Sequence, residues 1–287
     1  MFESLETRRM LSTVVAKFDD GAYVVKGSEQ KDHIHIVVDT FSTQSSRPVS
    51  AAAKLTGSRL GSGGGLASGA EARSFSASSS IQFVASSMVF DRVRVFDETG
   101  LIASTVQPAG SVREVNVLAG GGTDVVRVDN NGSGARVSIA GGDDDDYIDS
   151  NAARGAAGSF VNGGAGNDLI RLSVQKGTEG HLVYGEAGSD TIHGSESNDR
   201  LFGDNPLAAN DPAGADGDDA IFGNDGNDTL VGAEGADRLF GGAGDDLLDG
   251  QLGADKMDGG DGTDTAAARE PHDELISIER ISGEKRP

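Results

Sequence analysis

The side chains best suited to chemistry in this sequence are aspartates that return at fixed intervals. From Gly185 to Ala267 a nine-residue phrase, G-G-x-G-x-D-x-U-x with U apolar, occurs eight times. Its sixth position is aspartate in every copy, and looser copies at wider spacing precede it. The sixth-position aspartates are the candidate metal ligands: Asp124, Asp146, Asp168, Asp190, Asp199, Asp219, Asp228, Asp237, Asp246, Asp255 and Asp264.

Oxygen is the ligand atom that these turns offer, from aspartate carboxylates and from the bare carbonyls of glycine. Calcium takes six to eight oxygens at about 2.3–2.6 Å in a tolerant geometry, whereas Mg²⁺ demands a small octahedron and keeps its water. Zinc and copper prefer His or Cys, which the turns lack. The pattern therefore predicts several Ca²⁺ ions as the cofactor.

The same period predicts the elements that position the aspartates. Nine residues suit a six-residue turn and a three-residue strand, so two repeats close one coil with the apolar eighth residue inside. Stacked coils then pair their strands in parallel about 4.8 Å apart. Upstream, Asp124, Asp146, Asp168 and Asp190 lie 22 residues apart, and a variable turn replaces one nonapeptide. We expect an all-β, right-handed parallel β-helix or β-roll of 22-residue coils that pass into 18-residue coils at Asp190.

The nonapeptide closely resembles the hemolysin-type calcium-binding repeat, the RTX β-roll. The resemblance covers Gly185 to Ala267 and extends more loosely back to Ala119. It implies that each ion lies between two turns stacked on the same side. One column of turns would then run through Asp124, Asp146, Asp168, Asp190, Asp219, Asp237 and Asp255, and a shorter one through Asp199, Asp228, Asp246 and Asp264. The insertion after Phe202 should loop out without changing sides.

Two copies depart from the pattern. The repeat at Gly194 has Ser195 and Ser197 where glycine is preferred, so its site is the weakest of the array. The turn at Gly141 has Asp144 in the fourth position, and aspartate tolerates a left-handed backbone better than most residues.

Composition and charge limit the partners. The 287 residues include 43 Gly, no Cys and no Trp. Residues 1–118 carry 12 acidic and 12 basic side chains, whereas residues 119–287 carry 34 and 12, so the whole net charge of −22 lies on the repeats. This sign favours cations and disfavours nucleic acid. The sequence contains no run of about 18 apolar residues, so it predicts no transmembrane segment.

Five regions follow from these patterns. Residues 1–20 form an export-like or disordered segment, whose F-E-S-L-E-T-R-R-M-L-S resembles the "LExRxLL" opening of extracellular planctomycete proteins. Residues 21–118 form a β-strand cap with a low-complexity insertion at 40–80, and contain a faint repeat from Gly27 to His35. Residues 119–193 form the 22-residue coils, 185–267 the β-roll, and 268–287 a cap strand (Leu275 to Ile281) and tail.

No catalytic set accompanies the repeats. H-E-x-x-H and G-x-S-x-G are absent, and the five histidines are scattered. His33 and His35 share a strand face but lack a third ligand. We therefore expect no enzyme, and predict a secreted or cell-surface calcium-binding structural protein that folds on meeting external Ca²⁺. The alternatives are a polysaccharide-active, lyase- or epimerase-like β-helix and an adhesin module that binds cell-surface or matrix polysaccharide.

Overall fold

A computed structural model of the chain describes residues 15–19, 22–28, 30–43, 88–97, 100–131, 134–152, 158–174, 180–204, 217–267 and 272–282. Residues 1–14 and most of the low-complexity insertion lie outside this described part. The chain divides into one unit of residues 1–41 and 89–287 and a second of residues 42–88. The first unit contains all of the repeats.

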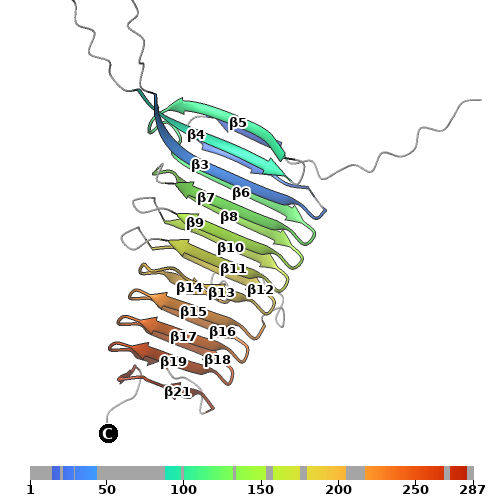
Figure 1. The fold of residues 1–287 in the computed structure, drawn as a ribbon. Coiled ribbons are helices and arrows are strands. Elements are labelled where there is room, and N and C mark those ends of the chain that lie inside the picture. The colour runs from blue at the N-terminus through green and yellow to red at the C-terminus, as the bar shows by residue number, and fades with distance from the viewer. Residues whose placement is uncertain are drawn as a thin grey trace, which may run out of the picture. The chain divides into compact units, whose positions relative to one another are not determined.

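The described residues of this unit form two sheets of stacked strands and no helix, in a parallel β-solenoid (Figure 1). The first sheet runs β1 (Val15–Asp19), β2 (Ala22–Lys26), β6 (Glu114–Gly121), β8 (Arg136–Asp143), β10 (Ser159–Ala165), β12 (Leu182–Ala187), β14 (Arg200–Phe202), β16 (Thr229–Glu234), β18 (Leu247–Leu252), β20 (Thr265–Ala267) and β22 (Arg280–Ile281). The second runs β21 (Glu274–Ile276), β19 (Lys256–Asp261), β17 (Arg238–Ala243), β15 (Ala220–Asp225), β13 (Thr191–His193), β11 (Leu169–Val174), β9 (Tyr147–Ala152), β7 (Val125–Asn131), β3 (His33–Thr43), β4 (Met88–Asp97) and β5 (Gly100–Pro108).

The register confirms both periods predicted from the sequence. Leu169 pairs with Tyr147 and with Thr191, 22 residues away on each side. Ala220 pairs with Arg238, an 18-residue step. Between these regions Thr191 pairs with Ala220, and the step of 29 is one short coil plus the insertion. The insertion therefore leaves β15 in the second sheet, as expected.

The apolar eighth positions form the core. In the second sheet they stack in register as Ile34, Val126, Ile148, Ile170, Ile192, Ile221, Leu239 and Met257. The matching ladder of the first sheet includes Leu201, Leu230, Leu248 and Ala266. All of these residues are at most 1% exposed, and in the tighter coils they form a thin core of two apolar ladders. Each ladder residue contributes about 1.5–3 kcal/mol on full burial.

The two ends of the stack differ. At the N-terminal end β1 runs antiparallel to β2, and β4 runs antiparallel to β5, so parallel stacking stops there. At the other end the single strand expected from Leu275 to Ile281 is two short strands, β21 and β22, in different sheets. Ser277, with a φ of 50°, lies between them. The segment is the last half-coil rather than one capping strand, and such short charged strands protect an open edge.

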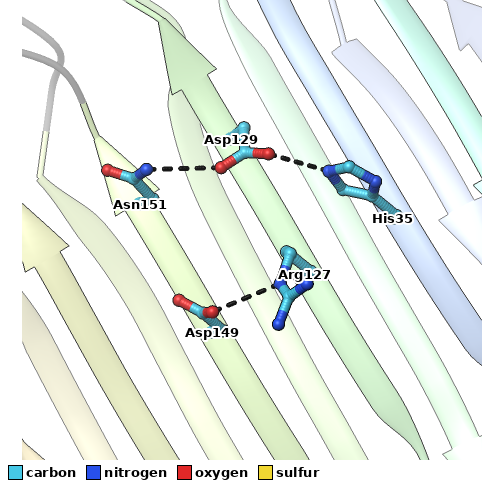
Figure 2. Close-up of polar contacts among 5 residues, drawn as sticks. All are labelled: His35, Arg127, Asp129, Asp149 and Asn151. Atoms are coloured by element: carbon cyan, nitrogen blue, oxygen red, sulfur yellow. Dashed lines mark hydrogen bonds and ion pairs between the residues drawn. The ribbon is translucent and has the colours of Figure 1, made fainter.

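The outer faces of the sheets carry polar and aromatic contacts. Asp129 receives both the imidazole of His35 at 2.8 Å and the amide of Asn151 at 3.3 Å, and Arg127 donates to Asp149 at 3.2 Å (Figure 2). In the tighter coils the rings of His193, Phe222 and Phe240 stack 4.7 and 4.9 Å apart. No helix within the described ranges is long and apolar enough to cross a membrane.

Candidate metal centres

The eleven predicted aspartates lie at two leading edges of the solenoid, each directly before a strand. Seven precede strands of the second sheet and form the long column: Asp124, Asp146, Asp168, Asp190, Asp219, Asp237 and Asp255. The other four precede strands of the first sheet and form the short column: Asp199, Asp228, Asp246 and Asp264. All eleven are at most 4% exposed. The structure therefore stacks the residues in the two predicted sets.

Within each column, one carboxylate oxygen is used to hold the coils in register. The backbone N–H of one aspartate donates to Oδ1 of the equivalent aspartate in the next coil. The pairs Asp168–Asp190 and Asp228–Asp246, for example, join at 2.7 Å, and the whole set lies between 2.7 and 3.0 Å. We call this series of N–H to Oδ1 hydrogen bonds the spine. It satisfies a buried N–H in every turn of a column and so fixes the position of the carboxylate.

The second carboxylate oxygen is different, because in most turns it is buried without a protein hydrogen bond. This holds for Oδ2 of Asp124, Asp146, Asp168, Asp190, Asp219, Asp228, Asp237, Asp246 and Asp264. A buried charged acceptor left unsatisfied costs about 1–3 kcal/mol or more. Nine repetitions of that cost in one small protein indicate a group that is bound there, and a cation is the group that a carboxylate oxygen accepts.

The glycine in the first position lets a backbone carbonyl approach the same oxygen. A Cβ on Gly241 would lie 2.4 Å from Asp246 Oδ2 and 2.6 Å from the carbonyl oxygen of Gly259 in the next coil. Gly141 would meet Asp146 Oδ2 and the Gly163 carbonyl in the same way. The lining is thus carboxylate and carbonyl oxygen from two successive turns, the donor set that suits Ca²⁺. No three His, Asp or Glu side chains in the described ranges gather to hold a metal by themselves, so backbone oxygens are needed.

The electrostatics of the columns oppose ionisation in the absence of a cation. Burial first, and neighbouring carboxylates after it, raise the pKa of Asp190 to about 9 and that of Asp219 to about 8. The same causes raise the pKa of Asp124, Asp146, Asp228 and Asp237 to about 7, and that of Asp168 and Asp246 to about 6. Carboxylates one coil apart repel by about 3 kcal/mol at an effective dielectric of 20. A divalent cation would reverse this balance.

Four residues outside the predicted set extend the columns. Asp32 lies above Asp124 and donates its N–H to Asp124 Oδ1, and Asp273 continues the long column below Asp255. Glu279 accepts from Asp264 N–H at 2.8 Å at the end of the short column. His181 occupies the equivalent position in the coil before Asp199, and its backbone N–H donates to Asp199 Oδ1 at 2.7 Å. The faint repeat at Gly27 signalled Asp32, but a buried histidine in place of aspartate leaves no mark in the repeat pattern.

The two departing copies behave differently. Asp144 has a φ of 76°, so it adopts the left-handed backbone that glycine adopts elsewhere, and its carboxylate accepts from Gly122 N–H at 3.1 Å. Ser195 instead donates from both its N–H and its hydroxyl to Asp199 Oδ2, at 2.7 and 2.8 Å. Outside the repeats, His35 Nε2 lies within hydrogen-bond distance of Asp129 Oδ2, at 2.8 Å.

Fold and turns together define a class of protein, a parallel β-solenoid with glycine turns that gather carboxylate and carbonyl oxygens. The family model described as the RTX calcium-binding nonapeptide repeat matches the chain in four copies, over residues 155–172, 177–205, 213–239 and 231–266. The chain therefore carries RTX, hemolysin-type calcium-binding repeats over these residues. Ca²⁺ is the ion that this repeat family binds, and several repeats imply several ions. A search of the curated proteins finds no match to the chain.

Proposed function

We propose that this chain is a secreted or cell-surface structural protein whose repeats fold and stiffen when they bind external Ca²⁺. The aspartates of the two columns, apart from Asp199, whose Oδ2 accepts hydrogen bonds from Ser195, would hold the ions, together with carbonyl oxygens of the turns that stack on them. The observation that carries the proposal is the set of nine buried Oδ2 atoms without a hydrogen-bond donor. Calcium supplies positive charge and a flexible oxygen coordination at those atoms.

Energetics favour coupling of binding to folding. Without cations the stacked carboxylates repel, and in the tighter coils the apolar ladders are only one residue wide on each sheet. A ligand that binds the folded state alone stabilises it by about 2.7 kcal/mol per site at a concentration of 100 times its dissociation constant. Several sites would therefore outweigh the repulsion where calcium is abundant. Low cytosolic calcium would leave the repeats expanded, which suits export.

Circular dichroism of the purified chain in EDTA and in millimolar Ca²⁺ tests this mechanism. We expect the β signal and the cooperative thermal transition to grow with calcium, with Mg²⁺ at the same ionic strength as the matched control. Equal β signals in EDTA and calcium would refute folding on binding. Digestion of intact producing cells with an external protease tests the location, because a cytosolic chain would be protected until the cells are broken.

One observation supports a second candidate function, saccharide binding. A hollow of about 430 Å³ lies where the 22-residue coils give way to the tighter ones, next to residues near the C-terminal ends of β9 and β11. Its lining includes the side chains of Asn151, Ser173, Glu196, Asn224 and Asp225. The lining residues that the structure describes offer amides, a hydroxyl and carboxylates and no cationic side chain, a set that suits a neutral or amino sugar and disfavours a uronate.

The repeats offer a matched test of this second function. Glu196 and Asp225 occupy the third position of their turns, as Glu234 and Asp261 do in turns further along the chain. Titration calorimetry with oligosaccharides of glucosamine, glucose and uronate should show binding that Glu196→Gln and Asp225→Asn weaken. Glu234→Gln and Asp261→Asn should leave it unchanged. Equal losses in both pairs would argue for a general charge effect rather than a site.

A further inference from the structure

Eleven described turns of the solenoid close in two ways, and the difference lies in the backbone of their second and fourth positions. In nine turns both positions have positive φ. The second-position residues are Gly120, Gly142, Gly164, Glu186, Asn224, Ala233, Gly242, Gln251 and Gly260, and the fourth-position residues are Gly122, Asp144, Gly166, Gly188, Gly226, Gly235, Gly244, Gly253 and Gly262. Non-glycine residues rarely adopt this conformation. We call these the open turns. In eight of these turns the aspartate Oδ2 is buried and accepts no hydrogen bond, so the N–H of the second residue does not reach it.

Two turns are built differently, and both read G-S-E in their first three positions. Ser28 and Ser195 stand in the second position, and neither is among the described residues with positive φ. Each turns its N–H onto the aspartate of its own turn, Ser28 onto Asp32 Oδ2 at 2.5 Å and Ser195 onto Asp199 Oδ2 at 2.7 Å. We call these the serine-closed turns.

The turn from Gly194 to Asp199 is closed by a small buried network. The Ser195 hydroxyl also donates to Asp199 Oδ2 at 2.8 Å, and it accepts the N–H of Ser197 at 3.1 Å. Both serines are at most 6% exposed. In the open turns Oδ2 is the atom available to a cation. In this turn Asp199 Oδ2 instead accepts two hydrogen bonds, and hydrogen bonds to a carboxylate are stronger than those between neutral groups.

The serine-closed turns occupy a common place, because each is the head of a carboxylate column. Asp32 is the first carboxylate of the long column, at the coil that the antiparallel strands cap. Asp199 is the first carboxylate of the short column, since His181 stands above it. His181 Nδ1 accepts the N–H of Ser159 at 2.9 Å, so it takes the place of an aspartate in the spine without its charge.

A head turn has a carboxylate neighbour on one side only. An ion between two stacked turns draws oxygens from both, so a head turn lacks half of the donor set on its outer side. Hydrogen-bond donors from the turn itself satisfy the carboxylate in that position without a second coil.

We propose that the turns at Gly27 and Gly194 are calcium-independent caps, in which serine in the second position takes the place of the ion. This inference rests on the proposed calcium binding and adds to it where each column starts. The caps hold the first carboxylate of each column in register before any ion binds, so that calcium binding proceeds along each column from a turn that is already formed. The identity of the second and fourth residues, rather than the invariant aspartate, then determines which turns take an ion.

Amide hydrogen exchange in the full chain tests the caps directly. In EDTA the N–H of Ser195 should be protected, whereas the equivalent N–H of Asn224, in the next open turn of the same column, should become protected only in calcium. Exchange of both amides at the same rate in EDTA would overturn the proposal. This readout does not depend on any variant being able to fold.

Ion counting by native mass spectrometry tests the same idea in both directions. Ser195→Gly with Ser197→Gly should open the Gly194 turn and add one calcium to the wild-type count. Asn224→Ser with Gly226→Ser gives an open turn the residues of the closed one, and should remove at least one. Ser195→Ala is the control, because it keeps the N–H donor and should not add an ion.

The outcomes separate this inference from the proposed function. Wild-type chain that binds several ions, with counts unchanged in both double variants, would overturn the caps and leave calcium binding intact. Wild-type chain that binds no calcium would overturn both.

Discussion

Replacing Asp246 with asparagine should change the stability of this protein in opposite directions with and without calcium. Asp246 lies in the middle of the short column, between Asp228 and Asp264. Its Oδ1 accepts from Asp228 N–H at 2.7 Å, and an asparagine oxygen would keep that bond. Its Oδ2 is buried without a donor. An asparagine amide nitrogen in that place is neutral and a donor only, so it cannot bind a cation.

The magnitudes follow from the column geometry. Each neighbouring carboxylate one coil away repels Asp246 by about 3 kcal/mol at an effective dielectric of 20, and partial protonation of the column reduces the gain on removing the charge to about 1–3 kcal/mol. In calcium the variant loses a charged ligand. A tenfold weaker dissociation constant costs about 1.4 kcal/mol for each ion affected. We therefore expect Asp246→Asn to be more stable than wild type in EDTA and less stable in millimolar calcium.

The assay is denaturant unfolding at pH 7.5, followed by circular dichroism in EDTA and in calcium. Asp245→Asn is the matched control. It removes the same charge from the neighbouring residue and keeps an acceptor for Thr263 N–H, but Asp245 is exposed and faces outward. The control should move stability little in either buffer. Destabilisation of Asp246→Asn in both buffers, or identical behaviour of the two variants, would refute the assignment of Oδ2 to a cation.

Two further predictions concern pH and the core. The folded-state pKa values of about 6 to 9 lie above the unfolded value near 4, so these aspartates stabilise the calcium-free fold fully below pH 4 and lose that contribution as pH rises through 6 to 9. The β signal in EDTA should therefore rise on acidification from pH 8 to pH 5. Calcium affinity should fall over the same range, because protons compete with calcium for the carboxylates. A calcium-free β signal that falls on acidification would contradict these pKa shifts. Leu239→Ala, at a 0% exposed ladder position, should cost about 2–5 kcal/mol in calcium by chemical denaturation, and Leu247→Ala, 42% exposed, should cost less than about 1 kcal/mol. Equal costs for the two leucines would contradict the inward ladder.

The sequence predicted the two columns because its period equals the period of the fold. When consecutive coils stack in register, residues that are one coil apart in sequence become neighbours in space, so the spacing of Asp124, Asp146 and Asp168 already contains their contact. The insertion after Phe202 did not disturb this, since Thr191 still pairs with Ala220. The apolar ladders were predictable for the same reason.

The heads of the columns needed the tertiary structure. Asp32 reaches Asp124 across 92 residues, and no period in the sequence joins them. The position that holds Asp199 in the short column is occupied further up the first sheet by His181, Ser159, Val137 and Val115. The sequence shows these four residues in ordinary strands, and only the register reveals that they share one buried position.

By itself, then, the sequence determined which aspartates stack, on which side, and with which ion chemistry, because all three depend on a local repeat and on the oxygen donors within it. The tertiary structure decided what each carboxylate oxygen contacts. Oδ1 is bound to a backbone N–H one coil away, and Oδ2 depends on the backbone conformation two residues into the turn. That conformation follows from packing against the neighbouring coil, so the serine that closes Asp199 and the glycine that leaves Asp246 open are told apart by their hydrogen bonds in the folded chain.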